Sequence, residues 1–157
     1  MKIGITGHQN REGIDWKWVR HQIELYLIGK SQIIGFSSLA SGTDQVFAEI
    51  VLAKRGALKA IIPLDDYETY FEGESLKNYK ELLKQSEAIF LQTNKTEEQA
   101  FLDAGKWIAR QVDCVIAVWD GEPAEGAGGT GDIVEYSLTL KKSILHINPI
   151  SRLIRTL

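Results

Sequence analysis

The segment from Asp113 to Glu135 constrains the fold of this chain more than any other. It begins with an apolar run, Cys114 to Trp119, whose lack of polar alternation is typical of a strand buried on both faces of a sheet. The run ends abruptly at Asp120, a glycine-rich loop follows, and apolar residues at helical spacing come next. The segment therefore predicts a buried strand, a loop and a helix in that order.

The same alternation of strand and helix recurs along the whole chain. Strands are predicted at Lys2 to Thr6, Gln32 to Phe36, Ala57 to Pro63, Ala88 to Gln92, Asp113 to Trp119 and Ser143 to Ile147. Such alternation favours an α/β, three-layer Rossmann-like fold, with a mainly parallel sheet and helices on both faces. Because no linker or repeat divides the 157 residues, we expect a single domain over residues 1–157.

Local signals predict where several helices begin. Asp15 is a candidate N-cap, and Thr96 with Gln99 forms a capping box. Ser41 with Asp44 forms a weaker one. The tail, Ile150 to Leu157, docks either on the body of the protein or on a neighbouring subunit, and the sequence leaves these alternatives open.

Composition narrows the function classes. The net charge of −3 argues against an electrostatic trap for nucleic acid, so we expect nucleic acid to be an unlikely partner. The single cysteine, Cys114, excludes an internal disulfide and is interpreted as a core residue. The histidines lack metal-ligand spacing, so no metal site is expected, and no cofactor is predicted. With no membrane-spanning run and no signal peptide, the expected location is the cytoplasm.

Polar and glycine-rich loops follow three of the predicted strands, at Thr6–Gly13, Ser37–Asp44 and Asp120–Gly131. If those strands are parallel neighbours, the loops meet at the carboxyl edge of the sheet, where open α/β sheets bind ligands. Each loop alone is also compatible with an ordinary turn. The candidate ligand-binding residues are Gly7, His8, Arg11, Ser38, Ser41, Gly42, Thr43, Asp44, Asp120, Gly121, Gly128, Gly129, Thr130, Gly131 and Asp132.

Roles follow from the residue types. Glycines 128, 129 and 131, with Thr130, allow backbone N–H groups to approach a phosphate at a helix N-terminus. Residues 41–43 would add donors, and Arg11 would meet a phosphate unless it is a solvated surface arginine. Asp120 and Glu135, or Asp44, would accept from sugar hydroxyls. Glu135 is also the candidate catalytic residue; its structural alternative is an exposed helix carboxylate.

An acidic and aromatic connector spans Asp65 to Ser75 and contains Tyr67, Tyr70 and Phe71. Aromatic side chains beside a strand end usually pack on the sheet edge. The less frequent alternative is that one of them covers a bound base or ring.

Four motifs together resemble the SLOG superfamily, which includes the Rossmann-like domain of DNA-processing protein A and the Lonely Guy proteins. They are Thr6-Gly7-His8, the segment Ser38 to Asp44, the segment Asp113 to Gly121, and Gly128-Gly129-Thr130-Gly131-Asp132-Ile133-Val134-Glu135. The resemblance spans essentially the whole chain and implies a Rossmann-like fold that binds a small-molecule nucleotide ligand. By the same resemblance a homodimer is expected.

The Lonely Guy motif Pro-Gly-Gly-x-Gly-Thr-x-x-Glu is matched at its glycines and its glutamate, with Ala127 in place of proline and Asp132 in place of threonine. Those enzymes are phosphoribohydrolases, so the resemblance implies N-glycoside cleavage with Glu135 at the ribose. A more distant similarity to nucleoside deoxyribosyltransferases points to the same residue. The family's catalytic arginine falls at Ala104, with Lys106 and Arg110 nearby.

The segment Ser38 to Asp44 echoes the Ser-Gly-x-Ala-x-Gly-x-Asp motif of DNA-processing protein A. That branch implies binding of single-stranded DNA, which requires a basic groove. The sequence therefore leaves three hypotheses, in order of preference: a nucleotide-binding domain, a nucleotide N-glycosidase and a DNA-binding module.

Overall fold

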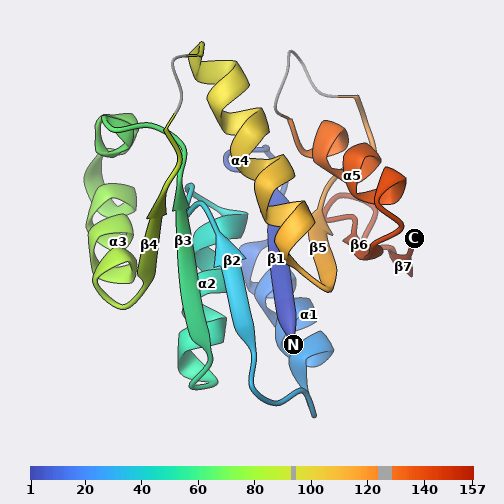
Figure 1. Cartoon of the computed structure of the whole chain (residues 1–157). Helices are drawn as coiled ribbons and strands as arrows, with labels where there is room; N and C mark the ends of the chain where they lie inside the picture. The colour runs from blue at the N-terminus through green and yellow to red at the C-terminus, as the bar shows by residue number, and fades with distance from the viewer. Residues whose placement is uncertain (93–94, 124–128) are drawn as a thin grey trace.

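The structure is a computed structural model that describes residues 1–92, 95–123 and 129–157. In these residues one sheet has the strand order β4-β3-β2-β1-β5-β6-β7 (Figure 1). The strands are β1 (Lys2–Gly7), β2 (Ile34–Ser37), β3 (Ala57–Ile62), β4 (Glu87–Phe90), β5 (Cys114–Val118), β6 (Ser143–Ile147) and β7 (Ile154–Thr156). All neighbouring strands are parallel except β6 and β7, so the predicted mainly parallel sheet is confirmed.

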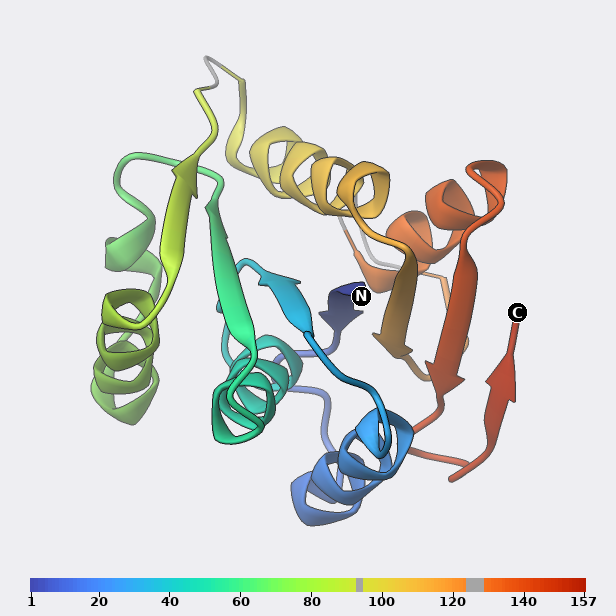
Figure 2. The same ribbon diagram turned by 60° about the horizontal axis from the view of Figure 1, so that its bottom comes forward.

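Helices cover both faces of the sheet, as predicted. They are α1 (Trp16–Leu27), α2 (Thr43–Ala53), the 3₁₀ helix η1 (Tyr67–Tyr70), α3 (Gly73–Lys84), α4 (Glu97–Gln111) and α5 (Thr130–Thr139). Figure 2 shows α1, α2 and α3 on one face and α4 and α5 on the other. The apolar clusters agree, because Ile116 packs with α1 and α2 while its neighbour Val115 packs with α4 and α5. Alternate residues of a buried strand thus build both layers of the core.

Strand β5 lies beside β1, the central strand of the sheet. All five of its residues are buried, and it pairs in parallel with β1 on one side and β6 on the other. On β1, Gly4 leaves room for α4, since a Cβ there would lie 2.7 Å from Ile108 Cγ2. The predicted buried strand is therefore confirmed, and its carboxyl end lies beside that of the central strand β1.

Several element boundaries differ from the sequence prediction. Strand β2 begins at Ile34 because Gln32 has a φ of 51°, which a strand cannot contain. The N-cap of α2 is Gly42 and not Ser41, so the capping box predicted for Ser41 and Asp44 is wrong. By contrast, Asp15 caps α1 by accepting from the N–H groups of Lys17 and Trp18, as predicted.

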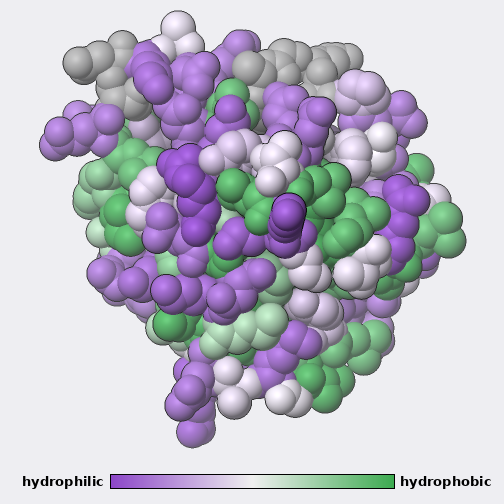
Figure 3. All heavy atoms as spheres, turned by 45° about the vertical axis from the view of Figure 1, so that its right-hand side comes forward, coloured by the Kyte–Doolittle hydropathy of each residue, from purple (hydrophilic) through white to green (hydrophobic). Residues whose placement is uncertain are grey.

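The tail docks on the body of the protein. Its last residues form β7, which is antiparallel to β6 and pairs Arg155 with His146. Leu157 and Ile144 exchange backbone hydrogen bonds of 2.8 and 3.2 Å. Figure 3, which looks at the side of the molecule carrying α5 and β7, shows hydrophobic side chains scattered among hydrophilic ones. Among the described residues, no helix is long and apolar enough to cross a membrane.

Candidate functional site

The loops after β1, β2 and β5 are in direct contact at the carboxyl edge of the sheet. The backbone carbonyl of His8 accepts from the N–H of Thr43 at 3.2 Å and from its hydroxyl at 2.8 Å. On the other side, the Asp120 N–H donates to His8 Nε2 at 3.0 Å. The close approach of the first two loops depends on Gly42, where a Cβ would lie 2.5 Å from the Gln9 carbonyl oxygen.

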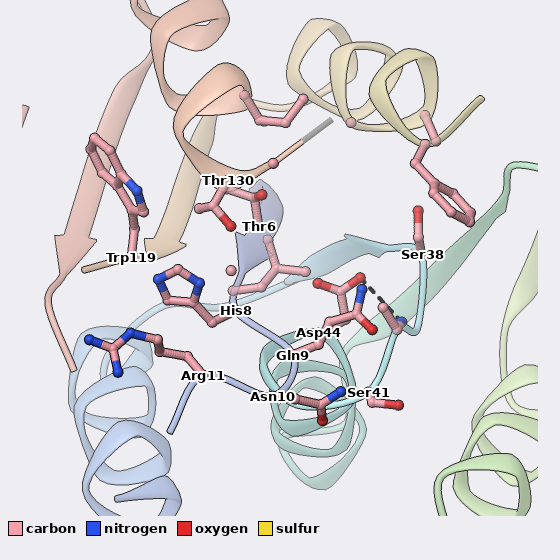
Figure 4. Close-up of a pocket in the computed structure, with 18 of the residues that line it drawn as sticks. Thr6, His8, Gln9, Asn10, Arg11, Ser38, Ser41, Asp44, Trp119 and Thr130 are labelled. Atoms are coloured by element: carbon pink, nitrogen blue, oxygen red, sulfur yellow. Dashed lines mark hydrogen bonds between the residues drawn. The ribbon is translucent and has the colours of Figure 1, made fainter. Parts of the chain in front are cut away.

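Between these loops lies a cavity of about 810 Å³, within the size range of small-molecule sites (Figure 4). Its lining comes from the three loops, the start of α5, one side of α4 and the segment around η1. The predicted site residues that line it are Gly7, His8, Arg11, Ser38, Ser41, Asp44, Asp120, Gly129, Thr130 and Gly131. Residues far apart in the sequence thus share one cavity.

Other predicted site residues do not line this cavity. Thr43 is fully buried against the first loop, and Gly42 faces the Gln9 and His8 carbonyl groups. Gly121, with a φ of 85°, forms the turn after β5. Asp132 and Glu135 lie on α5 outside the lining, and Glu135 is exposed to solvent. Gly128 lies outside the described residues, and the roles assigned to these residues stay predictions.

An aromatic wall closes one side of the cavity. We give this name to Tyr67, Tyr70, Phe71 and Phe101, which all line the cavity. Tyr67 contacts Phe71 edge to face at 5.0 Å between ring centroids, and Tyr70 meets Phe101 in the same way at 5.5 Å. The connector from Asp65 to Ser75 contains three of these rings, which pack together and also line the cavity. That one of them covers a bound base stays a prediction. Phe101 on α4 was missed, since the sequence does not show which helix faces the cavity.

On another side of the cavity, two of the predicted residues, Asp120 and Arg11, contact each other. The Asp120 carboxylate accepts from Arg11 Nε at 3.1 Å and from the Glu122 N–H at 3.0 Å. Burial tends to raise the pKa of Asp120, but the Glu122 N–H, the Arg11 guanidinium and the nearby His8 outweigh it and lower the pKa. Arg11 is therefore paired with a carboxylate through Nε, and its contact with a phosphate stays a prediction.

The segment after β5 is held in place by β6 and the turn that follows it. The buried His146 contacts the Trp119 carbonyl through Nε2 at 2.8 Å and accepts from Arg155 Nε at Nδ1. Asn148 Nδ2 donates to the Asp120 carbonyl at 3.1 Å. The position of Asp120 thus depends on contacts that reach as far as β7.

Asp44 is a buried carboxyl group in the cavity lining, with 8% of its surface exposed. Its Oδ2 accepts from the Ala40 N–H at 3.3 Å. Burial raises the pKa of Asp44 to about 7, although hydrogen bonds from the N–H groups of Ala40 and Ser38 and from Ser37 oppose the shift. Titratable groups with such shifts inside a cavity are concentrated at functional sites.

The N-terminus of α5 opens toward the cavity. Its N-cap is Gly129, and no side chain of the described residues caps it, in contrast to α1. The Asp132 N–H donates to the Gly129 carbonyl at 3.1 Å. The two earlier N–H groups of the helix, those of Thr130 and Gly131, have no acceptor among the described residues. The positive end of the helix dipole lies at these groups. Within the described ranges, no group of three His, Cys, Asp or Glu side chains is placed to hold a metal ion.

The fold is similar to that of solved structures. DNA processing protein A from Helicobacter pylori, described for its single-stranded DNA binding mode, superposes with a TM-score of 0.70 at 16% identity over 94% of this chain and 65% of that one. The same protein from Streptococcus pneumoniae gives a TM-score of 0.69 at 17% identity over 94% and 50%. TM1055, a structural genomics target, gives 0.57 at 15% identity over 91% and 71%.

These similarities confirm the predicted Rossmann-like fold and its resemblance to the fold of DNA processing protein A. This chain spans only 65% and 50% of the two DNA processing proteins. No family model matches the chain. No curated protein is similar to it in sequence.

Proposed function

We propose that this protein binds a nucleotide or a nucleotide-derived ligand in the cavity between the three loops. The observation that carries the proposal is that one cavity of about 810 Å³ joins the N-terminus of α5, which no side chain of the described residues caps, to an aromatic wall. A nucleotide has the matching parts, an anionic phosphate and a flat, polarisable base.

The phosphate belongs at the start of α5. Gly129 and Gly131 have no side chains to keep an anion from the backbone, and the Thr130 hydroxyl adds a donor beside them. The loop after β2 is less suitable, because Asp44 already occupies the Ala40 N–H and its carboxylate would repel a phosphate. The base then belongs at the aromatic wall, where ring stacking would stabilise it.

Binding fits the cavity better than N-glycoside hydrolysis does. The glutamate that the Lonely Guy resemblance assigns to the ribose is Glu135, which is exposed and outside the lining. The position of that family's arginine is Ala104, which does line the cavity but carries no charge. Arg110 is turned to the Tyr136 hydroxyl at 3.1 Å, outside the cavity.

The cavity also differs from a groove for single-stranded DNA. Among the described residues that line it, Arg11 is the one lysine or arginine, and it is paired with Asp120. Asp44, Glu97 and Glu122 add further carboxyl groups to the lining. A strand-binding groove instead follows the phosphate backbone with positive charge.

Isothermal titration calorimetry with AMP, ADP, ADP-ribose and adenosine tests the proposal. We expect saturable binding of the phosphate-bearing ligands. Thr130→Val should weaken them by about ten-fold, the usual effect of losing a hydrogen bond to a charged group, and leave adenosine unchanged. Thr139→Val is the matched control, because Thr139 is exposed at the other end of α5 and donates to the Tyr136 carbonyl.

Two results would overturn the proposal. One is the absence of binding across the ligand panel; the other is a salt-dependent gel shift of a single-stranded oligonucleotide without nucleotide binding. Release of adenine from AMP, lost in Glu135→Gln, would replace simple binding by the hydrolase alternative.

A further inference from the structure

Asp44 differs from the other carboxyl groups of the cavity in what its oxygens contact. Both oxygens of Asp120 are used by the protein, one by Arg11 and one by the Glu122 N–H. Glu97 lies in the exposed first turn of α4. Asp44 is buried, and its carboxyl group accepts from the Ala40 N–H in the preceding loop. Figure 4 shows this carboxyl group directed into the cavity.

The position of Asp44 lies between the two ends that the proposed function assigns. Its charge acts on Tyr67 in the aromatic wall, where it contributes to raising the pKa of that phenol after the larger effect of burial. In Figure 4 it lies between Ser38 on one side and Thr6 and Thr130 on the other. In a nucleotide the sugar joins the phosphate to the base. A ligand that spans the cavity would therefore place its sugar near Asp44.

We infer that Asp44 binds one ribose hydroxyl of the ligand and makes the cavity selective against nucleotides that lack this hydroxyl. This inference rests on the proposed function and deepens it, because it names the sugar that the same site selects. A carboxylate has only acceptor oxygens, so the ligand group facing it must be a hydrogen-bond donor. The sugar hydroxyls are the donors that a nucleotide carries between its two ends.

The hydrogen bonds around Asp44 leave capacity for such a donor. A carboxylate offers about four lone-pair positions. The protein supplies the N–H groups of Ala40 and Ser38 and a contact from Ser37. Burial outweighs these contacts and keeps the pKa of Asp44 near 7, so the ionised form is incompletely compensated. A ligand hydroxyl would add the missing hydrogen bond, whereas a sugar that lacks this hydroxyl would leave the buried acceptor without one.

The test compares AMP with 2′-deoxy-AMP and 3′-deoxy-AMP by calorimetry in the wild type and in Asp44→Asn. We expect the wild type to bind AMP about ten-fold more tightly than the analogue that lacks the contacted hydroxyl. Asp44→Asn keeps the shape and the Ala40 contact but removes the charge, and it should bring this ratio close to one by weakening AMP. The matched control is Asp65→Asn, since Asp65 is exposed and outside the cavity lining; it should keep the wild-type ratio.

Thr130→Val separates the sugar from the phosphate, because it should weaken all three ligands equally and preserve the ratio. A measurement on the wild type does not depend on the folding of any variant: the carboxyl ¹³C resonance of Asp44 should move with AMP more than with the discriminated analogue. Equal affinities for all three ligands, or an unchanged ratio in Asp44→Asn, would overturn the inference while leaving nucleotide binding intact. If the proposed function is wrong, none of the three ligands binds, and the inference about Asp44 is then wrong as well.

Discussion

The β2–α2 and β5–α5 junctions reach the same cavity but use their backbone groups in opposite ways. At β2–α2 the Thr43 N–H donates to the His8 carbonyl and the Gln45 N–H to the Ala40 carbonyl. The Asp44 carboxyl group then accepts from the Ala40 N–H. The start of α2 is therefore satisfied by the protein itself and serves to join loops.

Both helices begin with an N-cap glycine and without a side-chain cap from the described residues. At β5–α5, however, no group of the described residues accepts from the N–H groups of Thr130 and Gly131. Its rigid support lies further back, where His146 and Asn148 hold the carbonyl groups of Trp119 and Asp120. A βα unit is part of the scaffold when nearby protein groups accept from the N–H groups of its first helical turn. It is a candidate anion site when these N–H groups have no acceptor among the described residues.

Asp44→Asn should have the largest effect on stability, and the effect should grow as pH rises from 4 to 7. Because the pKa of Asp44 is raised from 3.8 to about 7 in the folded protein, its contribution is fully present below pH 4 and is lost as pH rises to 7. The loss over this window is on the order of 4 kcal/mol. Urea unfolding at pH 4 and pH 8 measures the effect. The free energy of unfolding of the variant minus that of the wild type should be higher at pH 8 than at pH 4 by about this amount.

The control for this prediction is Asp65→Asn, an exposed carboxyl group outside the cavity lining, whose difference from wild type should not follow the same course. A gap between Asp44→Asn and wild type that stays constant from pH 4 to pH 8 would contradict it. In that case Asp44 would not carry its proton in the folded state, and the contrast between the two junctions would lose its electrostatic part.

Gly42→Ala tests whether the close contact between the loops after β1 and β2 requires a residue without a side chain at position 42. A Cβ at Gly42 would lie 2.5 Å from the Gln9 carbonyl oxygen, and its φ is 80°. Overpacking and the left-handed backbone together should cost about 3 kcal/mol of unfolding free energy. Gly121→Ala in the β5–α5 loop is the control: its φ is 85°, but its nearest neighbour, Asn148 Nδ2, is 4.0 Å away. We expect about 1 kcal/mol there, and equal losses in the two variants would refute the distinction.

His146→Leu should have the smallest of these effects. It removes the contact of the Trp119 carbonyl with the buried imidazole and the acceptor of Arg155 Nε, at a cost of about 2 kcal/mol. His21→Leu on the exposed side of α1 should stay within about 0.5 kcal/mol of wild type. Urea unfolding measures both, and a loss at His146 no larger than that at His21 would mean that β6 and β7 do not support the β5–α5 junction.

Much of the fold was predictable because its signals are local. The uninterrupted apolar run of β5 predicted a strand buried on both faces, and Asp15 predicted the start of α1. The tail was not predictable: β7 is short, and its three residues are exposed, so no apolar pattern marks it. It exists because β6 offers an open edge on which a strand can pair.

The candidate site was predictable only in part. The sequence indicated that the three loops meet, because parallel neighbouring strands bring their carboxyl ends together. It did not show that Arg11 pairs with Asp120, a contact between residues 109 positions apart. It also did not separate Asp44, which faces the cavity, from its neighbour Thr43, which faces the first loop.

By itself, the sequence determined the order and type of the main elements, because hydrophobic period and helix caps act over a few residues. Only the tertiary structure decided which polar groups remain open to a ligand. That choice depends on burial and on hydrogen bonds between distant segments, such as those that occupy Thr43, whereas no side chain of the described residues caps the start of α5. The same residue types therefore became scaffold at one junction and candidate site at the other.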